Sequence, residues 1–506
     1  MISIIDTPLA GCPTIPEPRT GGWNPALEGA LLPGAAAARA KLAAGALVVT
    51  TGQQPGLFTG PLYTVYKALS ARSLAAALER RWGRPVVPVF WVAGDDHDYA
   101  EGSTAAWFGQ DGGLVRATLD PRDPDAPLRP LAREPVPAST AGWLDDLERS
   151  LPASPSRDEV VAWLRRHYRT DQTLGRAFGM ALAELLDPFG IVCLDASAPE
   201  VKLAATPLLL EAVRRAADLD ALLTARAAEL AAAGQPVSVK VGDGATLVFV
   251  EGAGGRDRLR RDGDALVARR SGERYTEPAL AALARAQPER FSPNVLLRPV
   301  MESVLLPTVA YVGGPGELRY LRLAEVLYPA LDAHRQIPVP RWSGVLVEPR
   351  VNRTADKFGL TVTELIAGDG ALEQRVLKSL SPEDFDPAFA AARQAIAAGF
   401  ERIAAVARQI DVTLEKPVIS GQNSAIGQLG DLEKRLLQAQ KRRQGELVSQ
   451  LDRARTAVRP DGEPQERVLG FPAFAGRYGG PALLEQLATH IDARYDAALE
   501  AGTATP

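Results

Sequence analysis

Cysteine and histidine are scarce in this chain, and each scarcity excludes a class of protein. Among 506 residues there are 2 cysteines and 4 histidines. Cys12 and Cys193 are too few and too far apart for the disulfide framework of a small secreted protein. No second histidine stands at zinc-ligand spacing from His97, which argues against a zinc hydrolase.

Long apolar runs and an excess of one charge are also missing. No segment approaches ~18 consecutive apolar residues, the length that a membrane span needs. Lysine plus arginine number 57 and aspartate plus glutamate 61, a balance that argues against a dedicated nucleic-acid binder. The stretch Met1–Ala10 has no basic start and no apolar core, so no signal peptide is expected. We therefore expect a protein of the reducing cytoplasm without membrane or nucleic-acid partners.

Short β-branched runs alternate with helical patterns along the first part of the chain. Ala46–Thr50 and Val86–Ala93 have the character of buried strands, and a helix is expected between them at about Pro61–Arg81. Further strands are expected at Ile191–Asp195 and Thr308–Val312. The order strand, loop, helix, strand predicts an α/β fold with a parallel sheet.

Changes in composition divide the chain into three parts. We expect a catalytic core at 1–380, an α-helical coiled-coil domain at 381–460, and a C-terminal segment at 461–506 that packs back on the core. Within the core, residues at about 109–160 are rich in Pro and Asp and look like an insertion. Residues at about 235–290 form a second insertion.

The second insertion and the coiled coil are predicted from periodicity. Val237–Val241 and Thr246–Val250 alternate apolar and polar residues between glycine-containing turns, which predicts a small antiparallel sheet. Phe389, Ile396 and Phe400 begin a series with spacings of three, four or seven residues, as in a coiled coil. Its helices pair either within one chain or with a second subunit.

A glycine-rich turn follows the first predicted strand. Gly52, Gly56 and Gly60 let the backbone approach a ligand closely, and the helix that follows favours phosphate at its N-terminus. The plain alternative is an ordinary turn, but the adjacent Gln53 and Gln54 favour a function. The candidate binding residues of this segment are Thr51, Gly52, Gln53, Gln54, Gly56, Phe58, Thr59, Gly60, Tyr63 and Lys67.

An acidic cluster follows the second strand, which ends near Trp91. Asp95, Asp96, Asp98 and Glu101 surround His97, at the strand end where open α/β sheets bind ligands. His97 suits acid or base chemistry near neutral pH, and the aspartates suit Mg²⁺. The alternative is a solvated acidic loop with an incidental histidine. The candidate residues are Trp91, Asp95, Asp96, His97 and Asp98, without a dedicated metal site.

A third group lies further along the chain. Gly313 and Gly314 follow a strand, and Glu317 stands in the first turn of the next helix, where the helix dipole also suits a simple cap residue. The alternative is that Glu317 receives a substrate amine while Asn294 and Arg298 receive carboxylates. Tyr320 belongs to the same motif, and Arg467 touches either the core or a ligand.

Taken together, these motifs carry a family resemblance. The segments at 51–70, 87–101, 292–300, 311–320 and 464–479 resemble, in order, the bacillithiol biosynthesis cysteine-adding enzymes, a family of cysteine ligases. The resemblance implies a Rossmann-like parallel-sheet core similar to class I aminoacyl-tRNA synthetases, with two connecting insertions. It also implies a C-terminal α-helical coiled coil associated with homodimers.

The activity that the resemblance implies is addition of L-cysteine to glucosaminyl malate, giving bacillithiol, with ATP and Mg²⁺ for carboxylate activation. His97 would then be the general base, with Asp95, Asp96 and Asp98 orienting the amine or the Mg²⁺. Two other functional hypotheses stay open. One is a metal-dependent hydrolase or nucleotidyl transferase that uses the Asp95–Asp98 cluster, and the other is a coiled-coil scaffold with a non-catalytic core.

Overall fold

The central sheet is built from short apolar runs, and its strands all run parallel in the order β13-β12-β2-β3-β6. The strands are β2 (Leu47–Gln53), β3 (Val86–Val92), β6 (Val192–Asp195), β12 (Thr308–Gly313) and β13 (Ile337–Pro340). β2 and β3 are buried along almost their whole length, as expected of a parallel sheet covered on both faces. The predicted α/β core is confirmed.

The computed structural model describes residues 2–7, 9, 12–17, 22–368, 372–379, 384–443 and 445–502. Contacts divide the chain into a small unit, Met1–Ile5 with Leu346–Gln465, and a large unit, Asp6–Val345 with Glu466–Pro506. We had expected the core to end at 380, but residues 380 and 381 lie outside the described residues. The division by contacts falls at Leu346.

Helices of the large unit follow and precede the sheet strands. α2 (Leu62–Trp82) joins β2 to β3 and ends at Gly83, whose left-handed backbone (φ 64°) suits a glycine C-cap. α10 (Arg298–Leu305) precedes β12, and α11 (Pro315–Ala324) follows it. α21 (Gly480–Gly502) packs on α2, where Arg72 donates to both carboxylate oxygens of Asp492 at 2.6 and 2.5 Å.

The second insertion is an antiparallel sheet in the order β10-β9-β8-β7-β11. Its strands are β7 (Ala245–Gly252), β8 (Gly255–Asp262), β9 (Ala265–Ala268), β10 (Arg274–Thr276) and β11 (Phe291–Pro293). β7 contains the predicted strand Thr246–Val250. The predicted strand Val237–Val241 is wrong: the segment contains no strand, and the edges of the sheet are formed by β10 and β11.

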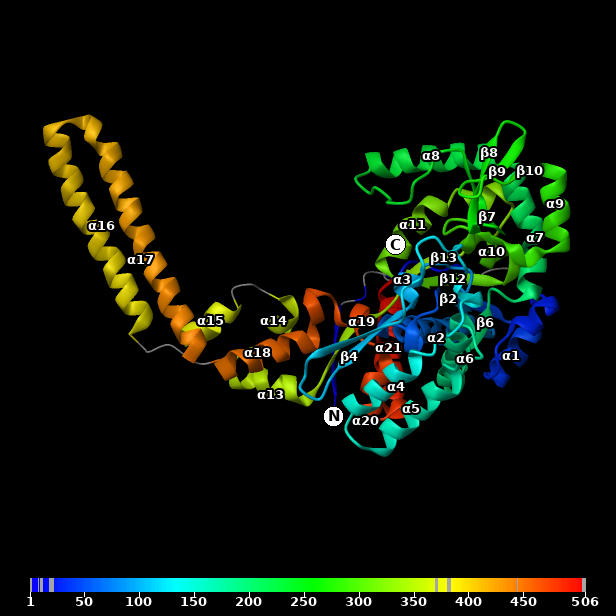
Figure 1. Ribbon diagram of the computed structural model, residues 1–506, viewed down its shortest axis with the longest axis horizontal. Helices are drawn as coiled ribbons and strands as arrows, with labels where there is room; N and C mark the ends of the chain where they lie inside the picture. The colour runs from blue at the N-terminus through cyan, green and yellow to red at the C-terminus, as the bar shows by residue number, and fades with distance from the viewer. Residues whose placement is uncertain are drawn as a thin grey trace. The chain divides into compact units, whose positions relative to one another are not determined.

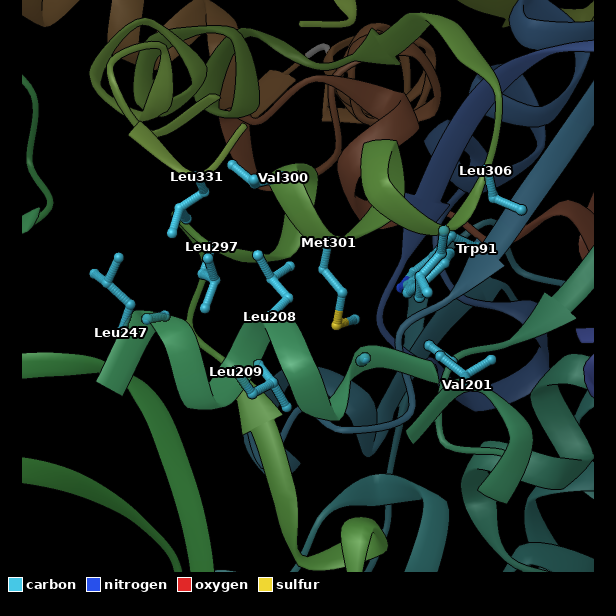
Figure 2. Packing of buried hydrophobic residues seen from close by; sticks show 14 of the residues in the cluster. Trp91, Val201, Leu208, Leu209, Leu247, Leu297, Val300, Met301, Leu306 and Leu331 are labelled. Carbon is cyan, nitrogen blue, oxygen red and sulfur yellow. The ribbon is translucent and has the colours of Figure 1, made fainter. Parts of the chain in front are cut away.

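One hydrophobic core connects this insertion to the parallel sheet. α7 (Pro199–Arg214) and α10 place apolar side chains between the two sheets. Figure 2 shows these side chains converging; they include Trp91, Val201, Leu208, Leu209, Leu247, Leu297, Val300, Met301, Leu306 and Leu331. Because a close-packed core transmits position rigidly, the inserted sheet holds its polar residues at a fixed place beside the parallel strands.

The small unit is helical. Its helices are α13 (Pro349–Lys357), α14 (Val362–Ala367), α15 (Leu372–Ser379), α16 (Phe385–Ile410), α17 (Glu415–Arg443) and α18 (Gly445–Val458). Figure 1 shows α16 and α17 side by side as a long hairpin, joined through the 3₁₀ turn η6 (Val412–Leu414). The predicted coiled-coil domain is confirmed, and its two long helices pair within one chain.

The remaining elements connect or flank these layers. An antiparallel hairpin of β4 (Thr104–Phe108) and β5 (Leu114–Thr118) begins just before the expected first insertion and ends within it. The others are β1 (Ser3–Thr7), η1 (Pro25–Ala30), α1 (Ala36–Ala43), η2 (Leu57–Thr59), α3 (Tyr99–Gly102), η3 (Leu131–Arg133), α4 (Thr140–Ser150), α5 (Pro155–His167), α6 (Leu174–Leu186), η4 (Asp187–Phe189), α8 (Ala216–Ala232), α9 (Glu277–Ala286), η5 (Pro288–Arg290), α12 (Leu327–Ala330), β14 (Ser343–Val347), η7 (Pro460–Gly462), α19 (Gln465–Val468) and α20 (Phe471–Tyr478). Of the helices that the structure describes, none has the length and apolar character needed to cross a bilayer.

Candidate active site

A polar cavity, here called the main cavity, opens at the carboxyl ends of β2, β3 and β12 and has a volume of about 690 Å³. Ligands of open α/β sheets bind at this edge. The predicted residues that line it are Gly52, Gln53, Gln54, Tyr63, Lys67, Trp91, Asp95, Asp96, Asn294, Arg298, Gly314, Glu317 and Tyr320. The predicted residues outside its lining are Thr51, Gly56, Phe58, Thr59, Gly60, His97, Asp98 and Gly313.

Lys67 joins two strand–helix units at the floor of the main cavity. Its ammonium donates to the Gly52 carbonyl at 2.6 Å and to Gln53 Oε1 at 3.0 Å, and it pairs with Glu317 Oε2 at 2.6 Å. Burial lowers the pKa of Lys67, although Glu317 opposes that shift. Burial works to raise the pKa of Glu317, but Lys67, the Tyr311 hydroxyl and the Gly314 N–H together outweigh it, so the net pKa is lowered. The positive charge of Lys67 is thus already balanced by a protein carboxylate.

The part of the glycine-rich turn from Gly56 to Gly60 lies outside the lining of the main cavity. Phe58 and Thr59 have left-handed backbones, with φ of 51° and 71°, and both are buried. The Tyr168 hydroxyl closes the turn by donating to the Gly56 carbonyl at 3.0 Å and accepting from the Thr59 N–H at 2.9 Å. A Cβ on Gly56 would meet the Cα of Gly60 at 2.8 Å, so these glycines let the turn pack on itself.

The start of α2 differs from the expected phosphate cradle. The N–H of Leu62 donates to the Leu469 carbonyl at 2.8 Å, and the N–H of Thr64 donates to the Pro61 carbonyl at 2.9 Å. Pro61 also bridges Gly470. The chain at Leu469–Gly470 therefore covers the helix start that we expected to face phosphate.

The acidic side chains after β3 do not all line the main cavity. Asp95 and Asp96 line the main cavity, and Asp95 pairs with the buried ammonium of Lys202 at 2.5 Å. Asp98 instead caps α3 by accepting from the Glu101 N–H at 3.1 Å. In the part of the chain that the structure describes, no three His, Cys, Asp or Glu side chains converge as a metal site. The expected Mg²⁺ ligands are thus not brought together.

His97 points to Arg256 of β8. Its Nδ1 lies 2.9 Å from Arg256 Nη1, and a guanidinium has no lone pair to offer, so Nδ1 accepts this hydrogen bond. The proton of the neutral ring then resides on Nε2. Burial lowers the pKa of His97, and Arg256 lowers it further. A general base needs a free lone pair facing the substrate, and this arrangement leaves His97 without one.

The Arg298 side chain also lines the main cavity. It donates to the hydroxyls of Tyr311 and Tyr320 at 3.2 and 2.9 Å and pairs with the buried Glu302 at 3.2 Å. Tyr311 in turn donates to Glu317 Oε1 at 2.5 Å. This network fixes the guanidinium at the cavity wall.

Asn294 and Glu317 also act as local supports. Asn294 Oδ1 accepts from the N–H groups of Leu296 and Leu297 at 3.0 and 2.9 Å and so stabilises the turn that leads into α10. Glu317 Oε2 accepts from the Gly314 N–H at 2.8 Å, as its cap interpretation requires. Its pairing with Lys67 comes in addition, so Glu317 serves both α11 and the floor of the main cavity.

Several cationic side chains of the main cavity were not predicted from the sequence. Arg256 and Arg258 come from β8, Lys240 from the coil before β7, and Arg341 from the end of β13. Arg467, which we had expected on either the core or a ligand, also lines the cavity. Isolated arginines on an inserted sheet carry no local motif, so only the packing of that sheet against the strand ends reveals them.

A parallel sheet with a large cavity at its carboxyl edge is typical of Rossmann-like proteins, which bind small molecules at that edge. The sequence model of the bacillithiol biosynthesis BshC N-terminal Rossmann-like domain matches residues 35–342, and that of the BshC C-terminal coiled-coil domain matches residues 344–494. The chain belongs to the BshC family.

Curated relatives agree with this assignment over most of the chain. Three of them, each named "Putative cysteine ligase BshC", come from Koribacter versatilis, Salinibacter ruber and Solibacter usitatus. They are 33%, 32% and 32% identical to this chain and match 90%, 87% and 86% of it. The matches cover 83%, 80% and 80% of the relatives themselves.

Proposed function

We propose that this chain is a carbon–nitrogen ligase that joins L-cysteine to the amino group of glucosaminyl malate and so forms bacillithiol. The names of its relatives motivate the reaction. The observation that carries the proposal is the main cavity, which holds carboxylates and guanidinium groups together in about 690 Å³. A cavity of this size takes a drug-sized ligand, and its two charge types suit substrates with both ammonium and carboxylate groups.

Asp96 and Glu101 are our candidates for receiving the substrate amine. Both line the main cavity, and neither forms an ion pair with a described residue, whereas Asp95 and Glu317 already pair with lysines. Burial raises the pKa of Glu101. A base whose pKa is raised toward the working pH accepts a proton more effectively. Glu101 therefore replaces His97 as our candidate general base.

ATP is our proposed activator, because an amide does not form favourably from a free carboxylate in water. The cysteine carboxylate would attack a phosphorus atom of ATP, forming an acyl–oxygen–phosphorus link and releasing pyrophosphate or ADP. The amine nitrogen would then attack the carbonyl carbon. The C–N bond forms, the bond between the carbonyl carbon and the bridging oxygen breaks with release of AMP or inorganic phosphate, and the amine proton passes to Glu101. Both an acyl-adenylate and an acyl-phosphate satisfy this scheme.

Mg²⁺ enters the proposal as the companion of ATP. The described acidic residues do not converge as a metal site, so no step of the reaction is assigned to a protein-held ion. Magnesium in ATP sites usually keeps several waters and binds the substrate phosphates with one or two carboxylates. We propose the reducing cytoplasm as the compartment, since Cys12 and Cys193 are both free thiols.

We also propose that the protein is a homodimer that forms through the hairpin of α16 and α17. Large apolar side chains stay exposed on both helices of the isolated chain, including Ile403, Val406 and Ile410 on α16 and Ile419 and Leu432 on α17. Such residues indicate an interaction surface when they gather on one element. A second copy of the same hairpin offers the matching apolar surface.

The two other readings are not favoured. A metal-dependent hydrolase that uses the Asp95–Asp98 cluster would need converging ligands, and Asp95 is held by Lys202 while Asp98 caps a helix. A scaffold with a non-catalytic core gives no reason for a cavity that holds charges of both signs.

The test is incubation of the purified chain with L-cysteine, glucosaminyl malate, ATP and Mg²⁺, followed by mass spectrometry. We expect bacillithiol, with AMP or ADP formed in equal amount; which nucleotide appears identifies the intermediate. Matched reactions without cysteine, or with serine in its place, should give neither product nor nucleotide turnover. Nucleotide breakdown that is independent of cysteine would instead indicate a hydrolase, and absence of both products would refute the ligase.

A further inference from the structure

Among the described residues, Arg256 differs from the other deeply buried cations that line the main cavity or its neighbour. Lys67, Lys202 and Arg341 are between 2% and 8% exposed, and each contacts a carboxylate. Arg256 is 9% exposed, and it forms no ion pair with any described residue. A guanidinium that is withdrawn from water without a counter-charge is unfavourable, and burial accordingly lowers the pKa of Arg256.

Neutral groups hold Arg256 in one orientation. Nε donates to Ser292 Oγ, Nη1 to His97 Nδ1 and Nη2 to the Pro293 carbonyl, each at 2.9 Å. The guanidinium lies over the Phe249 ring, 3.9 Å from its centroid. These contacts come from β7, β11 and the loop after β3, so the head group is fixed before any ligand arrives.

Three carboxylates, those of Asp95, Asp96 and Glu251, act electrostatically on Arg256, and two of them are paired with other cations. Asp95 pairs with Lys202 at 2.5 Å, and Glu251 pairs with Arg133 at 3.0 Å. Asp96 forms no ion pair with a described residue, but like Asp95 and Glu251 it does not contact Arg256. The guanidinium of Arg256 thus has no direct ion-pair partner among the described residues, and its contact positions are open to an anion.

Arg256 also retains donors for such a partner. A guanidinium has five N–H groups, of which three are used by Ser292, His97 and Pro293, which leaves two on Nη1 and Nη2. Its side chain borders both the main cavity and a neighbouring cavity of about 110 Å³ that also contains Lys202. Two parallel N–H groups are the geometry with which arginine binds carboxylate or phosphate.

We propose that Arg256 is the anchor for an anionic oxygen group of a substrate, and that His97 is the positioning residue that holds its guanidinium. The shared chemistry is that of a carboxylate or phosphate, from the malate moiety of glucosaminyl malate or from ATP. The choice of these probes rests on the proposed function. The site itself rests on the unpaired buried charge and its two free N–H groups.

Equilibrium binding of the full chain to each probe separates the two sources. Arg256→Gln should raise the Kd of one anion at least about tenfold, as expected for a lost hydrogen bond to a charged group. Methyl glucosaminide lacks the malate carboxylates, so its affinity should not change if malate is the bound anion. A selective loss for ATP would instead identify phosphate.

Two matched variants control for charge and folding. Arg260→Gln removes the same charge from the same strand at an exposed position and should leave both Kd values within about twofold. Arg256→Lys keeps the charge but loses the fork, so it should bind with intermediate affinity even if Arg256→Gln fails to fold. Unchanged Kd values in both Arg256 variants, or no binding of either anion by the wild type, would overturn the anchor.

His97 variants test the positioning role. The side-chain oxygen of His97→Asn can accept from Arg256 where Nδ1 does, whereas His97→Leu cannot. We expect His97→Asn to keep the anion Kd within about threefold, and His97→Leu to resemble Arg256→Gln. An amide cannot take up a proton, so a general base at this position predicts that both variants lose kcat while the Kd stays unchanged, which would refute the positioning role.

Failure of this site and failure of the ligase are distinguishable. If the anion binds in an Arg256-dependent way but no bacillithiol forms, the role of Arg256 as anchor is retained and the proposed reaction is rejected. Bacillithiol formation with wild-type Kd values and wild-type kcat/KM in Arg256→Lys would retain the reaction and reject the anchor.

Discussion

Glu302 is fully buried, and its counter-charge is the Arg298 guanidinium, with Nη1 at 3.2 Å from Oε2. Burial raises the pKa of Glu302 from 4.5 to about 7, although Arg298 opposes that shift. A carboxyl whose pKa is raised by folding contributes stability below its unfolded pKa, and this contribution is lost as the pH rises through the folded value. Glu302 therefore makes the large unit less stable as the pH rises from about 5 to about 8.

Glu302→Gln should remove this pH dependence. The pKa change from 4.5 to about 7 corresponds to roughly 3 kcal/mol. The melting temperature of the variant, measured relative to that of the wild type, should therefore increase as the pH rises from 5.5 to 8.5. Glu211→Gln, which alters an exposed carboxylate beside Arg214, should follow the wild type at every pH. If the melting temperatures of Glu302→Gln and the wild type change with pH in the same way, Glu302 is not the group that causes the pH dependence.

Glu101 is the residue whose role in catalysis can be tested most directly. The Tyr63 hydroxyl donates to its Oε1 at 3.0 Å, and burial raises its pKa. A general base must be deprotonated, so wild-type activity should fall as the pH drops through this raised pKa. Glu101→Gln should lower kcat by about 10²–10⁴ and abolish this acid limb of the pH profile. An unchanged limb in the variant would exclude Glu101 as the base.

At the scale of elements, the Lys67–Glu317 pair connects the β2–α2 unit to the β12–α11 unit. The Lys67 side chain is 3% exposed and that of Glu317 is 19% exposed. Removing one partner of a buried pair leaves the other charge uncompensated. Lys67→Met should therefore cost about 3 kcal/mol, the low end of the usual range, because Glu317 keeps some contact with water.

Denaturant unfolding of three variants tests this prediction. Lys67→Met combined with Glu317→Gln should recover part of the lost stability, since no buried charge is then left alone. Lys41→Met breaks the pair with Glu79, whose side chains are 46% and 34% exposed, and should cost less than about 1 kcal/mol. Equal losses at Lys67 and Lys41 would mean that the buried pair does not hold the two units together.

The parallel core was predictable because buried strands require apolar, β-branched runs that stand out in one sequence. Ala46–Thr50 and Val86–Ala93 were found in this way as β2 and β3. Val237–Val241 has the alternation of a strand but pairs with no strand of the sheet. Pairing depends on the whole sheet, so a local pattern cannot decide it.

The candidate site was predictable only in part, for a related reason. Residues at strand ends, such as Asp96 and Lys67, follow from the position of the strands. The partner of a side chain does not follow, because it comes from a distant part of the chain. His97 was assigned as a base before Arg256 was known to occupy its Nδ1. Gly56 was assigned to ligand approach, whereas it packs against Gly60.

At the scale of the whole molecule, the α16–α17 hairpin carries the proposed dimer contact. Ile403, Val406 and Ile410 lie at spacings of three and four residues, so they form one stripe along α16. They are 51%, 56% and 73% exposed in the isolated chain. An apolar stripe of this kind is costly in water and becomes buried when a second copy pairs with it.

Replacing Ile403 and Val406 together by aspartate should convert the dimer to a monomer. If each change removes about 2 kcal/mol of binding energy, the dimer Kd rises about a thousandfold. Arg408→Asp is the matched control, because its side chain lies about 200° beyond Val406 on the helix and points away from the stripe. Sedimentation equilibrium at micromolar concentration measures both variants. A monomeric wild type, or a dimer that survives the double substitution, would refute this interface, and equal dissociation by Arg408→Asp would make the effect one of charge.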